Sequence, residues 1–116
     1  MSDTLKYSFE MDNNVRIIHV SGSITVRTCR NLEDIMRPIT DNGNSIIAMK
    51  NVSFVTTSGM ESLMLISHKA RDRGHIVILL EPPSAIRELA VQMQLHMLLT
   101  FANTKDEAML KIRTFV

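Results

Sequence analysis

The stretch Phe54-Val55-Thr56-Thr57-Ser58-Gly59-Met60-Glu61 decides how the chain around it folds. An apolar run from Ser45 to Met49 leads toward this stretch, and apolar residues at helical spacing run from Met60 to Arg73 after it. The stretch therefore marks the point where a buried strand passes into a helix. Its three consecutive hydroxyl residues stand at the first turn of that helix, where backbone N–H groups lack partners and the helix dipole is positive. Such a helix start is suited to holding an anion, for example a phosphate group.

Two strands are expected on the N-terminal side of this stretch. Residues Lys6 to Met11 alternate between polar and apolar side chains, which is the period of a half-buried strand. Asp12-Asn13-Asn14 is typical of a turn, because Asn and Asp tolerate left-handed backbone. Val15 to Val20 is the second strand and Ser21-Gly22-Ser23 ends it, so the two strands are expected to form a hairpin.

A first helix is predicted between this hairpin and the strand that begins at Ser45. Thr25 or Thr28 is expected to cap its start, and Pro38 is expected to end it near Arg37, because proline interrupts helical hydrogen bonding. A polar turn from Thr40 to Asn44 follows. The residues on the buried face of this helix recur every three or four positions: Cys29, Leu32, Ile35, Met36 and Ile39.

The rest of the chain alternates strands and helices. Gly74 is expected to end the helix that starts at Met60, and the unbroken apolar run from His75 to Leu80 predicts a central strand. Ser84 is the expected N-cap of a third helix. Leu98 to Phe101 predicts a short edge strand, and Thr104 to Glu107 is a capping box that opens a last helix.

The resulting order of elements is β-β-α-β-α-β-α-β-α, which predicts an α/β fold in a single domain, residues 1–116. We expect a mixed, mostly parallel sheet that about four helices cover. In such sheets, functional side chains gather where strands run into helices. In this chain those places are Ser21–Ser23, Thr56–Glu61 and Glu81–Ser84.

Composition argues against several classes of function. The 116 residues carry 13 Lys and Arg against 12 Asp and Glu, and this net charge of +1 offers no strong field for binding nucleic acid. No apolar run approaches the roughly 20 residues that a membrane span requires, and the first residues lack the apolar core of a signal peptide. The single cysteine, Cys29, excludes an intrachain disulfide. We therefore expect a soluble cytoplasmic protein that does not insert into a membrane.

The sequence contains no pattern of catalytic or metal-binding residues. The four histidines are not spaced as metal ligands are, and Cys29 stands on an apolar helix face without an acid or base partner. Neither a glycine-rich phosphate loop nor a nucleophile elbow is found. The sequence therefore predicts no enzymatic activity, no cofactor and no metal site.

The order of elements and the motif Phe54–Met60 resemble the STAS domain, typified by bacterial anti-sigma factor antagonists. The resemblance covers almost the whole chain. At the motif, the family usually shows an aromatic residue, an apolar residue, Asp, Ser, Ser, Gly and Leu. Gly22 and Ile24, Leu95, and the pair Glu107-Ala108 also match positions that are typical of the family. This chain has Thr56 in place of the family's usual acidic residue.

This resemblance implies regulation of transcription through protein binding. In the family, a serine in the motif is phosphorylated by a partner that is both a serine kinase and an anti-sigma factor. The unphosphorylated antagonist binds that partner and frees the sigma factor, and a PP2C-type phosphatase resets the switch. The match implies that Ser58 is the acceptor, with Thr57 as a second candidate. The residues expected to bind the partner are Ser21, Gly22, Ser23, Thr56, Thr57, Ser58, Gly59, Met60 and Glu61.

Two alternatives remain open at the level of sequence. Ser58-Gly59-Met60-Glu61 is itself a capping box, so Ser58 can serve only to cap its helix. Glu61, where the family often has a small residue, would support that cap and repel a phosphate. The second alternative concerns function: the domain can be a constitutive STAS subunit of a larger assembly, such as a stressosome-like scaffold or a phospholipid ABC transporter, without phosphorylation.

Overall fold

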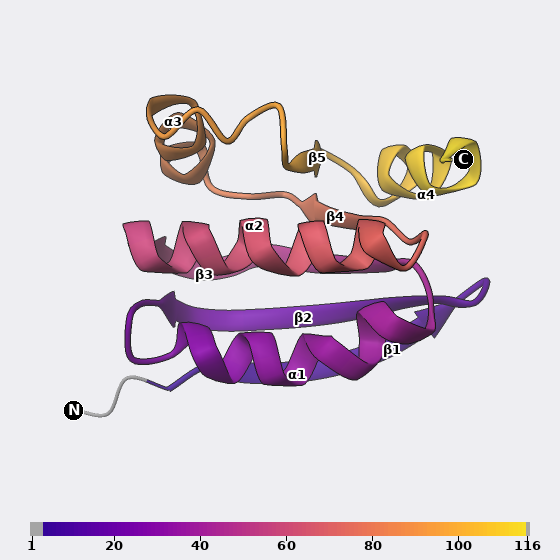
Figure 1. Ribbon diagram of the computed structural model, residues 1–116, viewed down its shortest axis with the longest axis horizontal. Helices are drawn as coiled ribbons and strands as arrows, with labels where there is room; N and C mark the ends of the chain where they lie inside the picture. Colours follow the sequence, from indigo (N-terminus) through magenta and orange to yellow (C-terminus); the bar gives the residue numbers. More distant parts are fainter. Residues whose placement is uncertain (1–3, 116) are drawn as a thin grey trace.

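In the computed structural model, residues 4–115 are described and form one α/β unit (Figure 1). Residues 1–3 and 116 of the expected single domain lie outside the described residues. The elements follow the predicted order: β1 (Lys6–Asp12), β2 (Val15–Ile24), α1 (Cys29–Asn42), β3 (Ser45–Val55), α2 (Thr57–Asp72), β4 (Val77–Leu80), α3 (Ser84–Gln92), β5 (Thr100–Ala102) and α4 (Lys105–Thr114).

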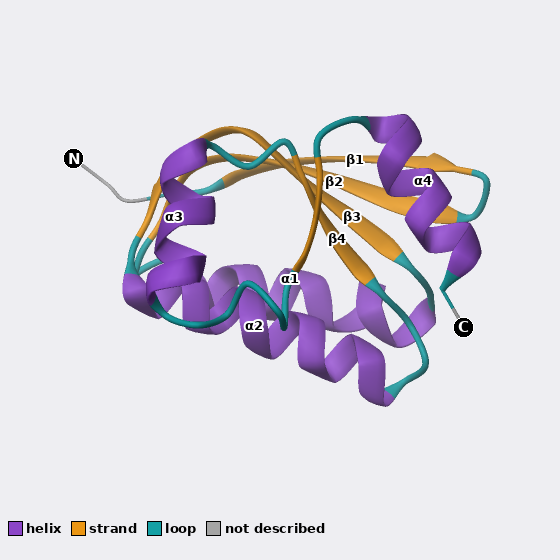
Figure 2. Ribbon diagram, turned by 90° about the horizontal axis from the view of Figure 1, so that it is seen from above, coloured by secondary structure: helices purple, strands orange, loops and turns teal. Residues whose placement is uncertain are grey.

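The five strands of the described chain form one sheet in the order β1-β2-β3-β4-β5. The β1–β2 pair is antiparallel and the other three pairs are parallel. Helices α1 and α2 lie side by side against one face, while α4 covers the other (Figure 2). Helix α3 packs at one end of the sheet and adds Ile86 and Ala90 to the core on the α1 and α2 side. The mixed, mostly parallel sheet covered by four helices confirms the predicted fold class.

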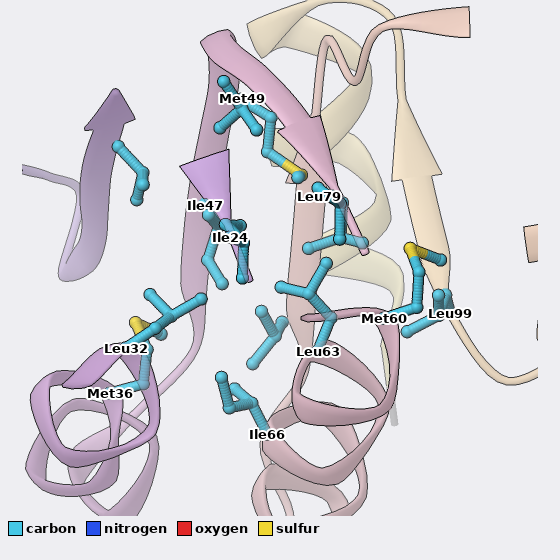
Figure 3. Close-up of a cluster of buried hydrophobic side chains, with 14 of the residues drawn as sticks. Ile24, Leu32, Met36, Ile47, Met49, Met60, Leu63, Ile66, Leu79 and Leu99 are labelled. Carbon is cyan, nitrogen blue, oxygen red and sulfur yellow. The ribbon is translucent and has the colours of Figure 1, made fainter. Parts of the chain in front are cut away.

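Strand β3 is the middle strand of the sheet, and its first half is buried on both faces. Ile47 and Met49 belong to the cluster beneath α1 and α2, whereas Ile46 and Ala48 belong to the cluster beneath α4. Figure 3 shows the first cluster; the side chains that it labels around β3 come from α1, α2, β4 and neighbouring segments. Each fully buried aliphatic side chain of this kind stabilises the fold by about 1.5–3 kcal/mol relative to an exposed one. This two-sided burial explains why the sequence of the strand is apolar without alternation.

The turn between β1 and β2 contains two residues in left-handed backbone, Asn13 with φ 50° and Asn14 with φ 67°. Two consecutive positive φ angles define a type I′ turn, whose twist matches that of the flanking strands. The turn fixes the register of the hairpin by placing Asp12 opposite Val15. The predicted hairpin and its turn chemistry are therefore confirmed.

Helix α1 does not end before Pro38, as the sequence had suggested, but continues through it to Asn42. Pro38 and Asp34 are both exposed. The carbonyl of Asp34, which loses its helical N–H partner to the proline ring, can therefore bond to water. The helix also gains an end contact, because Asn42 Nδ2 donates to the carbonyl of Pro38 at 2.6 Å. The expected turn at Thr40–Asn44 is correspondingly shortened to Gly43 and Asn44.

Two strands run further than their apolar segments. Strand β3 continues from Met49 to Val55, and β2 continues through Ser21–Ser23 to Ile24, because the two strands remain paired in parallel. Register shifts next to Ser21 and between Gly22 and Ser23 mark irregularities in this pairing. The hairpin ends where the sequence predicts, because the last pair of β1 and β2 is Lys6 opposite Ser21. Strand β2 itself continues to Ile24, because pairing with β3, which no local pattern reveals, extends both strands.

The two predicted helix caps near the C-terminus have different outcomes. The side chain of Thr104 accepts a hydrogen bond from the N–H of Glu107 at 3.1 Å, as the capping box predicts. Ser84 does not cap α3. It is the first residue of the helix, and Pro83 occupies the N-cap position without a side-chain hydrogen bond. The fixed backbone of proline sets the start of this helix instead.

Tyr7 on β1 provides a test of the fold by pH. Its hydroxyl donates a hydrogen bond to Asn31 Oδ1 of α1 at 2.6 Å, and burial raises its pKa to about 12 from 10.0. Because the unfolded chain ionises Tyr7 first, the stabilisation that it contributes is present below pH 10 and is lost as the pH rises toward 12. Since the protein has one tyrosine and no tryptophan, tyrosinate absorbance reports this group alone. A titration midpoint near 10 would contradict the placement of Tyr7, and Tyr7→Phe should remove this part of the pH dependence.

Candidate functional site

The candidate site lies where the paired ends of β2 and β3 meet the start of helix α2. Ile24 is opposite Val55 and Ser23 is opposite Phe54. The predicted segments Ser21–Ser23 and Thr56–Glu61 therefore come together at the carboxyl ends of β2 and β3. The hydroxyls of Ser23 and Ser53 are 3.3 Å apart across the strands. Ser21 is further from the helix start, opposite Asn51. The segments Ser21–Ser23 and Thr56–Glu61 thus lie at the same end of the β2–β3 pair, with Ser21 furthest from the helix start.

Thr56 makes three hydrogen bonds at the helix start, two to β2 and one within α2. Its N–H donates to the carbonyl of Ile24 at 3.0 Å, and its hydroxyl donates to the same oxygen at 3.4 Å. The hydroxyl oxygen also accepts the N–H of Gly59 at 3.2 Å. Thr56 is therefore the N-cap of α2, and its extended backbone, with φ −82° and ψ 173°, is the conformation that an N-cap residue adopts.

Ser58 is not the cap of this helix, and the capping box Ser58–Glu61 is not formed. The sequence favoured that alternative because the spacing is right, but β3 pairing ends at Val55 and places the extended cap residue at Thr56. Ser58 is then the second helical residue, and it is partly exposed. Within residues 4–115, the Ser58 hydroxyl has no hydrogen-bond partner. It is consequently available for chemistry or for contact with a partner.

Gly59 allows the first turn of α2 to touch the end of β2. A Cβ atom at this position would lie 2.5 Å from the carbonyl oxygen of Ile24 and 2.7 Å from Cγ1 of Val55. Real Cβ contacts are never that short, so any side chain would push the helix away from the strands. Gly59 and Met60 are both buried, Met60 completely. These two residues pack against the core side of the turn. The exposed residues of the turn are Thr57 and Glu61.

The segment after β2 is held in place by Thr28. The hydroxyl of Thr28 donates to the carbonyl of Ser23 at 2.8 Å and accepts the N–H of Thr25 at 2.8 Å. Thr28 occupies the N-cap position of α1 but makes no side-chain cap bond there. Gly22, whose φ is 112°, has backbone that suits only glycine, and a Cβ there would lie 2.8 Å from the carbonyl of Thr4. Both features fix the loop that borders the start of α2.

The structure adds two exposed apolar side chains that sequence reasoning did not assign to the surface. Val26 is 71% exposed in the loop after β2, and Phe54 is 54% exposed at the end of β3. Neither is marked by the sequence: the alternation of Val52 and Phe54 favours burial of Phe54, and no pattern singles out Val26. A shallow groove of about 280 Å³ runs from β3 to α3, and the third predicted segment contributes Pro83 to it. Its other lining residues are Ser53, Phe54, Val55, Ala85, Ile86, Glu88, Leu89 and Gln92.

The electrostatics of this turn are suited to a negative group. The first turn of α2 contains no acidic residue. The N–H of Gly59 is bonded to Thr56, but those of Thr57 and Ser58 precede the first intrahelical bond, from Met60 N to Thr56 O at 2.9 Å, and have no intrahelical acceptor. Together with the positive end of the helix dipole, they favour an anion near Ser58. Glu61, three residues further on, is the nearest acidic residue in sequence.

Among residues 4–115, no group of three or more His, Cys, Asp and Glu side chains is arranged to hold a metal ion. No helix in the same residues has both the length and the apolarity that crossing a membrane requires.

Comparison with known proteins places this geometry in a family. A family model of the STAS domain matches residues 6–108, which include every strand of the described chain, helices α1 to α3 and the first turn of α4. The chain belongs to the STAS domain family. This confirms the resemblance seen in the motif at Phe54–Met60. No protein of curated function matches the sequence significantly.

Solved structures show the same fold at low sequence identity. An anti-sigma factor antagonist from Mycobacterium paratuberculosis is 22% identical, with a TM-score of 0.80 over 97% of each chain. SpoIIAA, an anti-sigma factor antagonist, matches this STAS domain in its unphosphorylated form (20% identity, TM-score 0.68, 96% of this chain and 99% of that chain). The Bacillus protein in its phosphorylated form matches as well (18%, 0.68, 93% and 100%). The murine anion transporter Slc26a9 is 12% identical with a TM-score of 0.76, over 97% of this chain and 22% of the transporter.

The assignment of the cap predicts different effects for two neighbouring hydroxyl residues. Thr56→Ala should lower the free energy of unfolding by about 0.5–2 kcal/mol, because the N–H of Gly59 loses its acceptor. Ser58→Ala should change it by less than about 0.5 kcal/mol, as expected for a surface position without a bond. Urea denaturation of both variants measures the difference. A loss in Ser58→Ala as large as that in Thr56→Ala would show that Ser58 is the cap after all.

The close approach at Gly59 predicts that alanine is not tolerated there. Gly59→Ala should destabilise the protein by about 1–3 kcal/mol, as overpacking does, although alanine has the better helix propensity. Gly43→Ala is the matched control, because a Cβ at Gly43 meets nothing within 4 Å and its backbone is extended. Thermal or urea unfolding checks the pair. Equal stability of the two variants would mean that α2 can move away from Ile24 without loss.

Proposed function

We propose that this STAS domain is a phosphorylation-switched regulator that acts like an anti-sigma factor antagonist. Unphosphorylated, it binds an anti-sigma factor that is also a serine kinase; phosphorylation of Ser58 ends that binding, and a PP2C-type phosphatase restores it. The observation that carries the proposal is the Ser58 hydroxyl, which is partly exposed and without a bond because Thr56 caps the helix. The protein would act in the cytoplasm by binding, with no catalysis of its own.

The surface around Ser58 is suited to a partner that docks on neutral groups. Val26 and Phe54 offer exposed apolar area on the two segments that border the start of α2, the loop after β2 and the end of β3. Apolar side chains in the buried centre of an interface contribute most of its binding energy. A neutral serine in such an interface can be desolvated at modest cost, whereas a charged group cannot.

Phosphorylation changes that surface without requiring the fold to change. A phosphoserine carries about −1.5 to −2 charges at pH 7. At the second position of α2 this charge meets the positive end of the helix and the N–H groups of Thr57 and Ser58. A partner that binds with micromolar affinity gains about 8 kcal/mol. Burying an uncompensated dianion removes several kcal/mol of that, which is enough to release the partner.

Glu61 does not block this switch. Residues three apart on a helix have Cβ atoms about 5–6 Å apart, so a phosphate on Ser58 and the Glu61 carboxylate would repel each other. Because Glu61 is exposed and takes no part in the cap, its side chain can turn away without loss of a helix bond. The existence of SpoIIAA structures in both phosphorylated and unphosphorylated forms supports a switch of this kind on the same fold.

Incubation with the anti-sigma-type serine kinase of the same organism tests the acceptor. Intact-mass measurement should show the gain of one phosphoryl group in the wild-type protein and in Thr57→Ala, and no gain in Ser58→Ala. Thr57 is the matched control because it is an adjacent and more exposed hydroxyl. A gain that survives Ser58→Ala would refute the assignment of Ser58, and the absence of any gain in the wild-type protein would refute the switch.

The effect on binding can be measured separately. Ser58→Glu should weaken binding of the kinase partner at least tenfold, or about 1.4 kcal/mol, by calorimetry. Leu110→Glu places the same charge on the exposed side of α4, across the sheet, and should leave the affinity unchanged. Equal affinity of Ser58→Glu and wild type would show that the partner does not dock on this turn.

A second candidate function is a constitutive STAS subunit of a larger assembly, such as a stressosome-like scaffold or a phospholipid ABC transporter. The match to Slc26a9, in which this fold makes up 22% of a transporter chain, favours it. In that case no phosphate is needed, and Thr56 in place of the usual acid has no consequence. Co-purification discriminates between the two: a kinase-like protein supports the switch, and a membrane ATPase or a large scaffold supports the subunit.

A further inference from the structure

Strand β1 forms a long edge of the sheet. It has seven residues, no proline and no glycine, and within residues 4–115 only β2 pairs with it. The opposite edge strand, β5, has three residues. Edge strands in proteins are usually kept short, charged or covered, because their unpaired backbone groups attract another strand. On β1, Phe9 is 57% and Met11 58% exposed, so the edge offers apolar area as well as backbone groups.

The side chains of β1 separate cleanly between the two faces. Tyr7 and Phe9 lie opposite Val20 and Ile18, which belong to the core beneath α1 and α2, so they and Met11 are on that face. The rings of Tyr7 and Phe9 stack with centroids 6.4 Å apart. The other face carries four polar side chains: Lys6, Ser8, Glu10 and Asp12. An apolar strip and a polar strip therefore run along the same edge.

The turn determines which backbone groups face outward. In an antiparallel ladder, alternate residues direct both N–H and C=O at the partner strand, and residues that flank a two-residue turn do so. Asp12 flanks the turn opposite Val15, so it, Glu10, Ser8 and Lys6 are bonded toward β2. Tyr7, Phe9 and Met11 consequently direct their N–H and C=O groups away from the sheet. These are the residues that an added strand would bond to.

The sequence of β1 is complementary to itself when it is reversed about Phe9. In that register Phe9 meets Phe9, Tyr7 meets Met11, Ser8 meets Glu10, and Lys6 meets Asp12, all on matching faces. Both ends then place Lys6 across from Asp12, whose carboxylate also pairs with Lys105 of its own chain at 2.8 Å, and the three outward-facing residues meet one another. We propose that β1 pairs in antiparallel fashion with β1 of a second copy of this chain, which joins two sheets into one of ten strands.

A register centred on Ser8 fits less well. It would set Lys6 opposite Glu10, but it would pair only the five residues from Lys6 to Glu10 and leave Met11 beyond the strand of the copy. A register centred on Glu10 would place two glutamates opposite each other, which destabilises a strand pair. Only the register centred on Phe9 uses all seven residues.

Cysteine cross-linking tests both the dimer and its register, in a Cys29→Ser background that removes the native thiol. Phe9→Cys should give a covalent dimer on mild oxidation, because directly opposite hydrogen-bonded residues have Cα atoms about 5.5 Å apart, within the reach of a disulfide. Ser8→Cys is the matched control: it is equally on the edge, but in this register it lies opposite Glu10 and should remain monomeric. A higher yield from Ser8→Cys, or equal yields from both, would overturn the proposal.

Sedimentation velocity provides the second measurement, on the protein without new cysteines. The wild-type chain should form a concentration-dependent dimer, and Phe9→Lys should weaken it at least tenfold by placing two cations together at the two-fold axis. Phe9 is exposed, so this variant should fold with unchanged circular dichroism. A wild-type chain that stays monomeric at every concentration, or a Phe9→Lys variant that dimerises as well as wild type, would refute the pairing.

Discussion

The carbonyl oxygen of Ile24 is the atom on which the rest of the structure depends. It accepts both the N–H and the hydroxyl of Thr56, and the Cα of Gly59 rests against it too closely for any side chain. This single contact sets where β3 stops, where α2 begins and how near the helix comes to the sheet. The completely buried Met60 and Leu63 then enter the core at fixed positions. Because Gly59 and Met60 pack against the strands and the core, the solvent-facing side of the first turn consists of Thr57, Ser58 and Glu61.

Much of the fold could be predicted because the spacing of apolar residues within short segments indicates each strand and helix. Alternation gave β1, spacing of three or four residues gave the helices, and the unbroken apolar segments gave β3 and β4. The errors occurred where distant parts of the chain decide the outcome. Strand β3 runs on to Val55 because β2 remains beside it, and α1 passes through Pro38 where both Pro38 and Asp34, whose carbonyl loses its helical partner, are exposed. No pattern within a short window contains either fact.

The candidate site shows the same division. The sequence correctly brought the hydroxyl residues to the start of a helix, but the spacing of Ser58 and Glu61 favoured Ser58 as the cap. The cap is Thr56 instead, because the β2–β3 ladder, which is a tertiary feature, ends at Val55. As a consequence, the Ser58 hydroxyl makes no hydrogen bond within the described residues, and the Glu61 side chain takes no part in the cap. The same ladder exposes Phe54, which the apolar pattern alone would have buried.

The two surfaces proposed for binding are compatible because of strand direction. Strand β1 runs antiparallel to β2, so Lys6 lies beside Ser21 toward the end where α2 starts, and Asp12 lies at the other end beside Val15 (Figure 1). A second copy paired antiparallel through β1 is therefore reversed, and its own α2 start lies at the opposite end of the joined sheet. Two partners would then approach from opposite ends without meeting. A phosphate on Ser58 would leave the Phe9 axis unaffected, so phosphorylation would release partners while the pair of STAS domains stayed together.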